Sequence, residues 1–106
     1  MAMDRGPWSS PEQDLNAADF CAVCLIDENE PGKDKIKANC SLPVRKQPGG
    51  AIYVQAMHAA AAALAGARGG VKASGASKAK AARKLTAFYR QAKETPPDSL
   101  KQLAGQ

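Results

Sequence analysis

Apolar residues show two different patterns in the N-terminal half of the chain. Residues 20–26 (FCAVCLI) are continuously apolar and have the length of a buried strand. From Lys35 to Leu42 every second residue is apolar, which is the period of a half-buried strand. The polar residues 27–34 between them contain the turn signal Pro31-Gly32. The pattern predicts an antiparallel β-hairpin, which needs a packing partner because a lone hairpin is marginally stable in water.

Helical patterns dominate the C-terminal half. Residues 51–65 include five consecutive alanines and predict one helix, which ends at Gly66 or at Gly69-Gly70. Its apolar face is expected to hold Ile52, Ala56, Ala59, Ala60, Ala63 and Leu64. A second helix is predicted over 78–93 with Ser77 as its N-cap. Its apolar stripe is expected to hold Ala81, Leu85, Phe88 and Ala92, with Ala82 and Tyr89 beside them.

Short helices are predicted at both ends of the chain. Ser10 and Pro11 favour a helix over residues 11–18, and Pro96-Pro97 precede a closing helix that ends at Gly105. We expect residues 1–18 to form a leader with this short helix, and the pattern leaves open whether the leader is ordered. Residues 19–106 are expected to form a single small domain. The predicted fold class is α+β, with an antiparallel β-hairpin packed on two main helices and short helices at both termini.

The amino-acid composition limits how much apolar surface the core is able to bury. The 106 residues include 22 alanines but only one tryptophan, two tyrosines and two phenylalanines. Because alanine contributes little apolar area, we expect a small core and marginal stability. No run of 18 apolar residues exists, which argues against a membrane-spanning helix, and the N-terminus lacks the apolar region of a secretory signal. A reducing, cytosolic compartment is therefore expected, and an odd cysteine count fits it better than a disulfide framework.

Charge is unevenly distributed. Residues 1–34 carry eight acids and two bases, whereas residues 35–106 carry thirteen bases and two acids. The net charge of +5 thus conceals an acidic third of −6 and a basic remainder of +11. Two interpretations stay open: a positive face that binds a partner, or an acidic segment that folds onto the basic part and neutralises it.

The three cysteines and the one histidine have the composition of a Cys₃His zinc site, formed by Cys21, Cys24, Cys40 and His58. Geometry favours another interpretation, in which the hairpin is symmetric about Glu30 and Pro31. Cys21 then lies opposite Cys40, and the two are buried core neighbours that act as small hydrophobic residues. A Cys21/Cys24 redox pair is the third alternative, although such a pair needs its first cysteine at a helix N-terminus. We therefore predict no metal and no cofactor, and keep zinc as the minority interpretation.

Basic residues concentrate in the glycine-rich connector and the helix predicted over 78–93. Backbone amides of the connector and of the helix N-terminus are able to bind phosphates by donating hydrogen bonds. The opposing interpretation is an ordinary solvated helix face, since no set of base-reading side chains accompanies the charges. The candidate nucleic-acid-binding residues are Arg68, Lys72, Lys78, Lys80, Arg83, Lys84 and Arg90.

Catalytic motifs are missing from the sequence. It contains no phosphate-binding loop, dinucleotide fingerprint, nucleophile elbow or paired carboxylates on one face. Local spacing places neither a serine nor a carboxylate beside His58. We therefore expect no enzymatic activity and predict no catalytic residues.

The order of features resembles a group of small viral domains. An apolar strand carries Phe20, a polar loop leads to Ser41-Leu42-Pro43, and an alanine-rich helix ends at Leu64. The basic run 78–85 (KAKAARKL) and the C-terminal Pro96-Pro97 complete the pattern. Over residues 19–100 this is similar to small domains of tailed-bacteriophage and prophage proteins, some attached to head-morphogenesis proteins such as the prohead protease. The resemblance implies a non-enzymatic role in a virion or its assembly, in the bacterial host cytoplasm or the virion itself.

Three functions follow as expectations. The first is a bacteriophage structural or assembly module that contacts a phage or host protein, with a basic face that also touches nucleic acid. The alternative is a small basic DNA- or RNA-binding protein, and the third is a zinc-stabilised adaptor. No membrane partner is expected, and the oligomeric state stays open.

Overall fold

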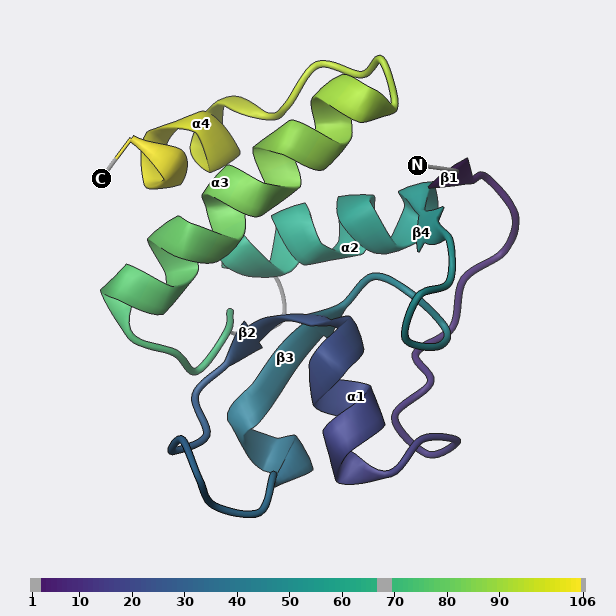
Figure 1. Ribbon diagram of the computed structural model, residues 1–106. Coiled ribbons are helices and arrows are strands. Elements are labelled where there is room, and N and C mark those ends of the chain that lie inside the picture. Colours follow the sequence, from purple (N-terminus) through teal and green to yellow (C-terminus); the bar gives the residue numbers. More distant parts are fainter. Residues whose placement is uncertain (1–2, 67–69, 106) are drawn as a thin grey trace.

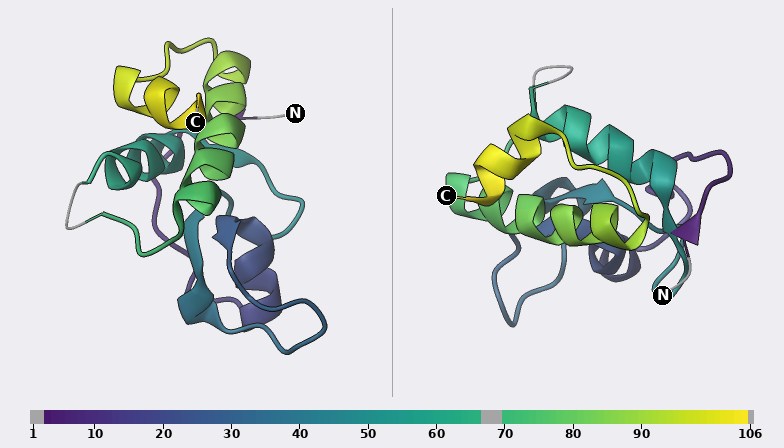
Figure 2. Two further views of the ribbon diagram at one scale, coloured as in Figure 1. Left: turned by 90° about the vertical axis from the view of Figure 1, so that its left-hand side faces the viewer. Right: turned by 90° about the horizontal axis from the view of Figure 1, so that it is seen from above.

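Three helices form one side of the molecule, and a short strand pair with a further helix forms the other. The computed structural model describes residues 3–66 and 70–105. In chain order the elements are β1 (Met3–Asp4), α1 (Ala17–Val23), β2 (Cys24–Asp27), the 3₁₀ turn η1 (Lys37–Asn39), β3 (Cys40–Pro43), β4 (Ile52–Tyr53), α2 (Val54–Leu64), α3 (Gly75–Gln91) and α4 (Asp98–Ala104). Helices α2, α3 and α4 lie together, and the β2–β3 pair lies below them with α1 (Figure 1, Figure 2). The fold is therefore α+β, as the sequence predicts.

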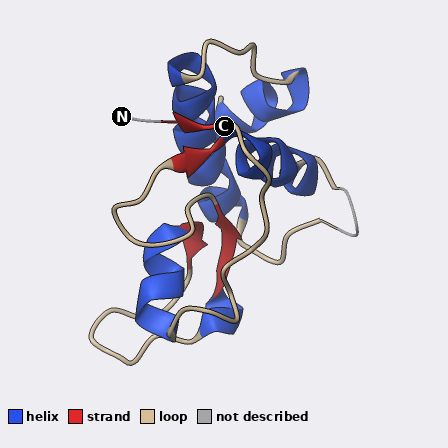
Figure 3. Cartoon of the chain, turned by 90° about the vertical axis from the view of Figure 1, so that its right-hand side faces the viewer, coloured by secondary structure: helices blue, strands red, loops and turns tan. Residues whose placement is uncertain are grey.

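Strands pair in two small, separate sheets (Figure 3). Strands β2 and β3 are antiparallel, with Cys24 opposite Pro43 and Asp27 opposite Cys40. Strand β1 pairs in parallel with β4, and it brings the N-terminal segment onto the domain. Trp8 follows it and packs against Tyr53, with ring centroids 5.3 Å apart. Segment 3–8 therefore has both backbone and aromatic contacts with residues far away in the sequence.

The buried side chains form two clusters. The main one joins β2, β3 and helices α2, α3 and α4, and its most deeply buried large side chains include Ile52, Met57, Leu85 and Leu100. A smaller cluster beneath α1 contains only Phe20, Cys21, Val23 and Cys40 as buried members. No helix among the described residues is both long and apolar enough to cross a membrane.

The strand predicted over 20–26 is wrong in its first half, which is helical. Asn16 caps α1 through its side chain, which accepts a hydrogen bond from the Asp19 amide at 2.8 Å. Phe20, Cys21 and Val23 are then buried on one side of a helical turn. A continuous apolar run does not distinguish a buried helix from a buried strand, and here capping by Asn16 favours the helix. The helix predicted over 11–18 is correspondingly displaced, since only a single turn follows Pro11.

The strand predicted over 35–42 begins later than expected, at Cys40. Ile36 is 57% exposed, and residues 37–39 form η1 instead of extended chain. Alternating burial is confirmed only within β3, where Cys40 and Leu42 are buried. The predicted hairpin thus exists, but with four residues in each strand.

Both main helices exist, with different starting points. Helix α2 begins at Val54 after β4, and its buried face holds Val54, Met57 and Ala61 where the pattern placed Ala59 and Ala63. Helix α3 begins at Gly75, because Ser74 and not Ser77 is the cap. The α3 stripe is confirmed for Ala81, Leu85, Ala92, Ala82 and Tyr89, while Phe88 is half-buried. Gly66 follows α2 with φ 105°, and Gly105 caps α4, as predicted.

Candidate functional site: a basic groove between α3 and β2

Loop 28–39 is organised by the side chain of Asn29. Its Oδ1 accepts a hydrogen bond from the Ile36 amide at 2.9 Å, and its Nδ2 donates to Asp27 Oδ1 at 2.8 Å. The same Nδ2 lies 3.2 Å from the Cys40 Sγ and 3.6 Å from the Cys21 Sγ. The side-chain amide of Asn29 therefore connects the start of the loop, at Asp27, with Ile36 near its end.

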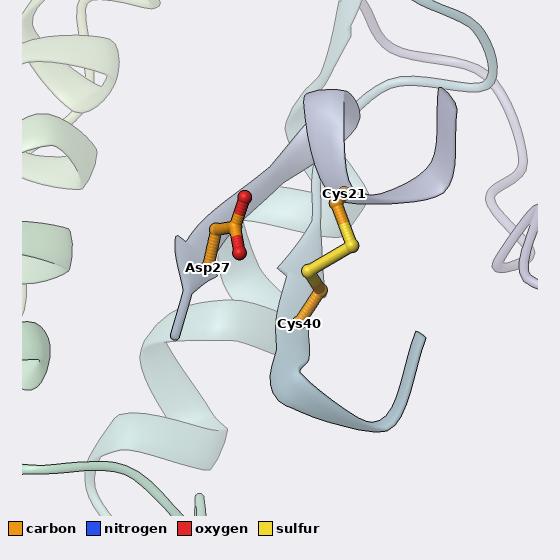
Figure 4. Close-up of side chains that lie close together, drawn as sticks. All are labelled: Cys21, Asp27 and Cys40. Atoms are coloured by element: carbon orange, nitrogen blue, oxygen red, sulfur yellow. A yellow bond between two sulfur atoms is a disulfide. The ribbon is translucent and has the colours of Figure 1, made fainter. Parts of the chain in front are cut away.

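Cys21 and Cys40 form a disulfide, which joins α1 to β3 (Figure 4). The prediction that these two cysteines are neighbours is confirmed. The prediction that they are free core thiols is wrong, and so is their pairing across the hairpin, because Cys21 belongs to α1 and Asp27 lies opposite Cys40. The odd cysteine count leaves Cys24 as the free thiol.

The zinc set of the sequence does not converge on one centre. His58 Nε2 lies 2.6 Å from Glu94 Oε1, so His58 is hydrogen-bonded to Glu94. It does not belong to the group of candidate ligand atoms around the cysteines. The described residues contain one group of candidate ligand atoms, from Cys21, Asp27 and Cys40, all within 4.8 Å of one another (Figure 4). Two of these atoms are the sulfurs of the disulfide, whereas zinc requires separate thiolates. The arrangement is therefore that of a covalent cross-link beside a carboxylate.

The candidate nucleic-acid-binding residues are spread over α3 and the connector before it. On α3 the exposed bases are Lys80, Arg83, Lys84 and Arg90, opposite the buried stripe. Lys78 is half-buried, Lys72 precedes the helix in the connector, and Arg68 lies outside the described residues. At 100° per residue, Arg83 lies about 60° and Arg90 about 80° around the helix axis from Lys80, so the four exposed bases of α3 occupy an arc of about 120°.

The N-terminus of α3 already holds a carboxylate. Glu28 Oε2 accepts hydrogen bonds from the Ser74 amide at 3.3 Å and from the Ser77 hydroxyl at 3.0 Å. The hydrogen bond from the Ser74 backbone, followed by that from the Ser77 side chain, lowers the pKa of Glu28. A phosphate at this position would have to displace Glu28, so the geometry does not favour the helix N-terminus as an anion site.

Two adjoining hollows separate α3 from the segment 22–27. The first has a volume of about 310 Å³ and is lined by Ser77, Lys80 and Lys84 on one side and by Asp27 on the other. The second, of about 360 Å³, is lined by Lys84, Ala87 and Phe88, with Arg45 and Val23 across from them. Both hollows share Ala22, Cys24, Leu25 and Lys84, and we call them together the α3–β2 groove.

Charge along the α3–β2 groove is mainly positive. Lys80 and Lys84 are exposed, and within the described part of the chain neither forms a salt bridge. Asp27 is the acid of the groove, and it is paired with Lys35. Partial burial works to raise the pKa of Asp27, but hydrogen bonds from Lys35 and Asn29 outweigh it and lower the pKa. The groove therefore offers two lysines without a salt bridge among the described residues, and it becomes more apolar toward the end lined by Phe88.

The free thiol of the groove is unreactive at neutral pH. Burial, followed by the charges of Glu12 and Asp27, raises the pKa of Cys24 to about 12. Its reactive thiolate is then scarcely populated at pH 7. Cys24 therefore lines the groove as a protonated thiol.

Several residues of these sites were not found from the sequence. Asn29, Glu28 and Glu94 each bind partners between 7 and 89 positions away, and local spacing does not predict such contacts. From the sequence, Lys80 and Lys84 are only two of the seven candidate nucleic-acid-binding residues, and their i, i+4 spacing places them on the same side of α3. What the sequence did not show is that β2 lies across from them.

No protein-family model matches the chain, and no match was found among the curated proteins or the solved structures.

Proposed function

We propose that this protein is a non-enzymatic binding module whose α3–β2 groove receives a negatively charged segment of a partner protein. The observation that carries the proposal is the pair Lys80 and Lys84, which are exposed, form no salt bridge within the described residues, and line the groove together with Ala22 and Leu25. Charged side chains that rim an apolar cleft select partners of opposite charge and speed their encounter. Following the resemblance to phage domains, the partner is a phage or host protein met during particle assembly.

Binding fits the groove better than catalysis. The raised pKa keeps Cys24 protonated, so the groove has no activated thiol. His58 is bonded to Glu94 on the helical side of the molecule and does not line the groove. The groove residues therefore supply charge and shape without an acid–base or nucleophilic pair.

Nucleic acid is the second candidate, favoured by the four exposed bases of α3. A duplex would contact Arg83 and Arg90 as well as the two groove lysines, because phosphates spread along a helix face. Its affinity would fall steeply with salt, through counterion release. Dependence on Arg83 and Arg90 therefore separates this function from groove binding.

The test compares two charge-reversal variants. Lys80→Glu/Lys84→Glu changes the groove, and Lys101→Glu on α4 is the matched control on another exposed surface. Pull-downs from phage-infected bacteria should capture acidic proteins with the wild type and with Lys101→Glu, and lose them with the groove variant. Equal capture by all three proteins would refute the groove as the binding site.

Duplex DNA is measured in parallel by fluorescence anisotropy at low and moderate salt. Tight, salt-sensitive binding that is lost in Arg83→Glu/Arg90→Glu would establish the second candidate in place of the first.

A further inference from the structure

Two polar side chains, those of Asp27 and Asn29, lie beside the disulfide. The sulfur atoms of Cys21 and Cys40 and a carboxylate oxygen of Asp27 lie within 4.8 Å of one another (Figure 4). These three residues belong to α1, β3 and β2, so only the folded chain brings them together. Reduction of the disulfide turns the group into two thiols beside a carboxylate. Thiolates together with a carboxylate form a ligand set that zinc accepts.

The Asn29 amide marks the point where hydrogen-bond acceptors converge. Its Nδ2 donates to Asp27 Oδ1 at 2.8 Å and lies 3.2 Å from the Cys40 Sγ and 3.6 Å from the Cys21 Sγ. The Ile36 carbonyl oxygen is a fourth neighbour, at 3.3 Å. A side-chain amide carries two hydrogens, so it cannot satisfy four acceptors at once. The cluster therefore has more acceptors than its donor serves, which favours a cation.

Charges at this position balance for a divalent ion. After reduction and loss of two protons, two thiolates and Asp27 carry three negative charges. A zinc ion and the ammonium group of Lys35, which is paired with Asp27, neutralise all three. Cys21 and Cys40 are buried, and buried charges need such compensation. The Asn29 N–H groups can then donate to the sulfurs, as the outer partners of metal ligands do.

The cluster also has a route to solvent. Cys21 and Asp27 both line the first hollow of the α3–β2 groove. Three protein ligands leave one position of a tetrahedral zinc ion for water, and the hollow supplies that water. Lys80 and Lys84 line the same hollow, but both are exposed, so solvent screens their charge from the ion.

We propose that in the reduced protein Cys21, Cys40 and Asp27 bind zinc, which replaces the disulfide as the cross-link beneath α1. A dithiol reductant opens the disulfide: its own sulfurs become a disulfide, and its two hydrogens pass to Cys21 and Cys40. Zinc then binds the two sulfurs as thiolates and releases both protons. In the reverse direction a disulfide oxidant takes up two electrons and two protons, the protein disulfide forms again, and the metal is released.

This ligand set differs from the one that the sequence suggested. Cys24 and His58 lie outside the group of converging atoms, and Asp27 joins Cys21 and Cys40 instead. The zinc ion would connect α1, β2 and β3, whereas the disulfide connects only α1 and β3. The site does not depend on which partner the groove receives, so it goes beyond the function proposed above.

The first experiment titrates cobalt(II), a spectroscopic substitute for zinc, into the full chain in metal-free buffer. A phosphine keeps the chain reduced and becomes a phosphine oxide with oxygen from water. We expect one ion per chain, with the intense visible absorption of tetrahedral cobalt–thiolate coordination, and displacement of cobalt by zinc. The oxidised protein should not develop this absorption. If the reduced protein binds neither metal, the proposal is overturned.

Two variants identify the ligands. Asp27→Asn removes the charged oxygen at nearly constant size and should weaken zinc binding at least tenfold. The matched control is Cys24→Ser/His58→Ala, which lacks the other two residues of the sequence-based set and should bind zinc like the wild type. Both variants are first compared with the wild type in the oxidised state by circular dichroism. Unchanged affinity of Asp27→Asn, or loss of binding by the control, would overturn the assigned ligands.

X-ray absorption at the zinc edge tests the same assignment in the wild-type chain, without any substitution. We expect two sulfur neighbours at about 2.3 Å and two lighter neighbours at about 2.0–2.2 Å. Three sulfurs would make Cys24 a ligand and contradict the proposed set.

A stability measurement shows whether the folded state is what binds zinc. The urea midpoint of the reduced wild type should rise with zinc, because an ion that binds the folded state stabilises it. The midpoint of Cys21→Ser/Cys40→Ser should not respond. A reduced wild type whose midpoint is the same with and without zinc would contradict a cross-link in the folded protein.

Discussion

Removing the disulfide should destabilise the protein by a predictable amount. Cys21 and Cys40 are separated by 19 residues, and a cross-link that closes a loop of this size lowers the entropy of the unfolded chain. The loop-closure relation gives about 3 kcal/mol of lost stability for Cys21→Ser/Cys40→Ser. For a chain of this length that is a large share of the total free energy of unfolding, which is typically 5–15 kcal/mol for a domain.

The loss should be concentrated under α1. The small cluster beneath this helix has four buried residues, and two of them are the bridged cysteines. Without the bridge, Phe20 and Val23 remain to hold α1, and the Asn29 amide loses its fixed sulfur neighbours. Hydrogen exchange in the double variant should therefore accelerate most in α1 and loop 28–39, and least in the main cluster around Leu85.

Urea unfolding followed by far-UV circular dichroism measures the effect, with Cys24→Ser as the control. This control keeps the bridge and removes only the free thiol. Because its raised pKa keeps Cys24 protonated, disulfide exchange through it should be slow, and the control should unfold like the wild type under oxidising conditions. A double variant as stable as the wild type, or a wild type whose midpoint is unchanged by a reducing agent, would refute the reasoning.

Three further changes test other parts of the structure. Leu85→Ala removes a fully buried side chain of the main cluster and should cost about 2–5 kcal/mol in urea unfolding. Ser74→Ala removes the α3 cap and should cost about 0.5–2 kcal/mol by the same assay, with Ser99→Ala on α4 as the control. Glu94→Gln tests pH dependence. The hydrogen bond from His58, with help from Arg5, lowers the pKa of Glu94, so its stabilisation is present above its ordinary pKa and is lost as pH falls. The thermal midpoint of the wild type should therefore drop more than that of Glu94→Gln between pH 6 and pH 3, and parallel profiles would contradict this.

Local sequence signals predicted the C-terminal helices well. Alanine content and the spacing of Ala81 and Leu85 are properties of adjacent turns, so they indicate α2 and α3 without knowledge of the rest. Gly105 likewise ends α4 for a local reason, since glycine is favoured after the last helical turn. The exact start of α3 was missed because Ser74 and Ser77 are both good caps, and Glu28, 46 residues before Ser74, is hydrogen-bonded to both of them.

The N-terminal half was predicted less well because long-range contacts determine it. Ile36 fits an alternating pattern, yet hydrogen bonds to Asn29 hold its backbone at the surface. The continuous apolar run that contains Phe20 fits a buried helix as well as a buried strand. The pairing of β1 with β4 joins residues 49 positions apart, which two-residue strands cannot indicate.

Acidic side chains occupy both ends of α3. Glu28 covers the N-terminus of α3, and Glu94 lies just beyond its C-terminus, bonded to Arg5 and His58. Glu28 comes from the acidic third but is hydrogen-bonded to Ser74 and Ser77, and Glu94 comes from the basic remainder, so these contacts do not neutralise the basic part of the chain. The middle of α3, with Lys80 and Lys84, lines the α3–β2 groove. The helix amides that suit a phosphate are already occupied by Glu28, so an anionic partner at the groove has to bind through the lysine side chains. This division favours the carboxylates of a partner protein over the phosphates of nucleic acid.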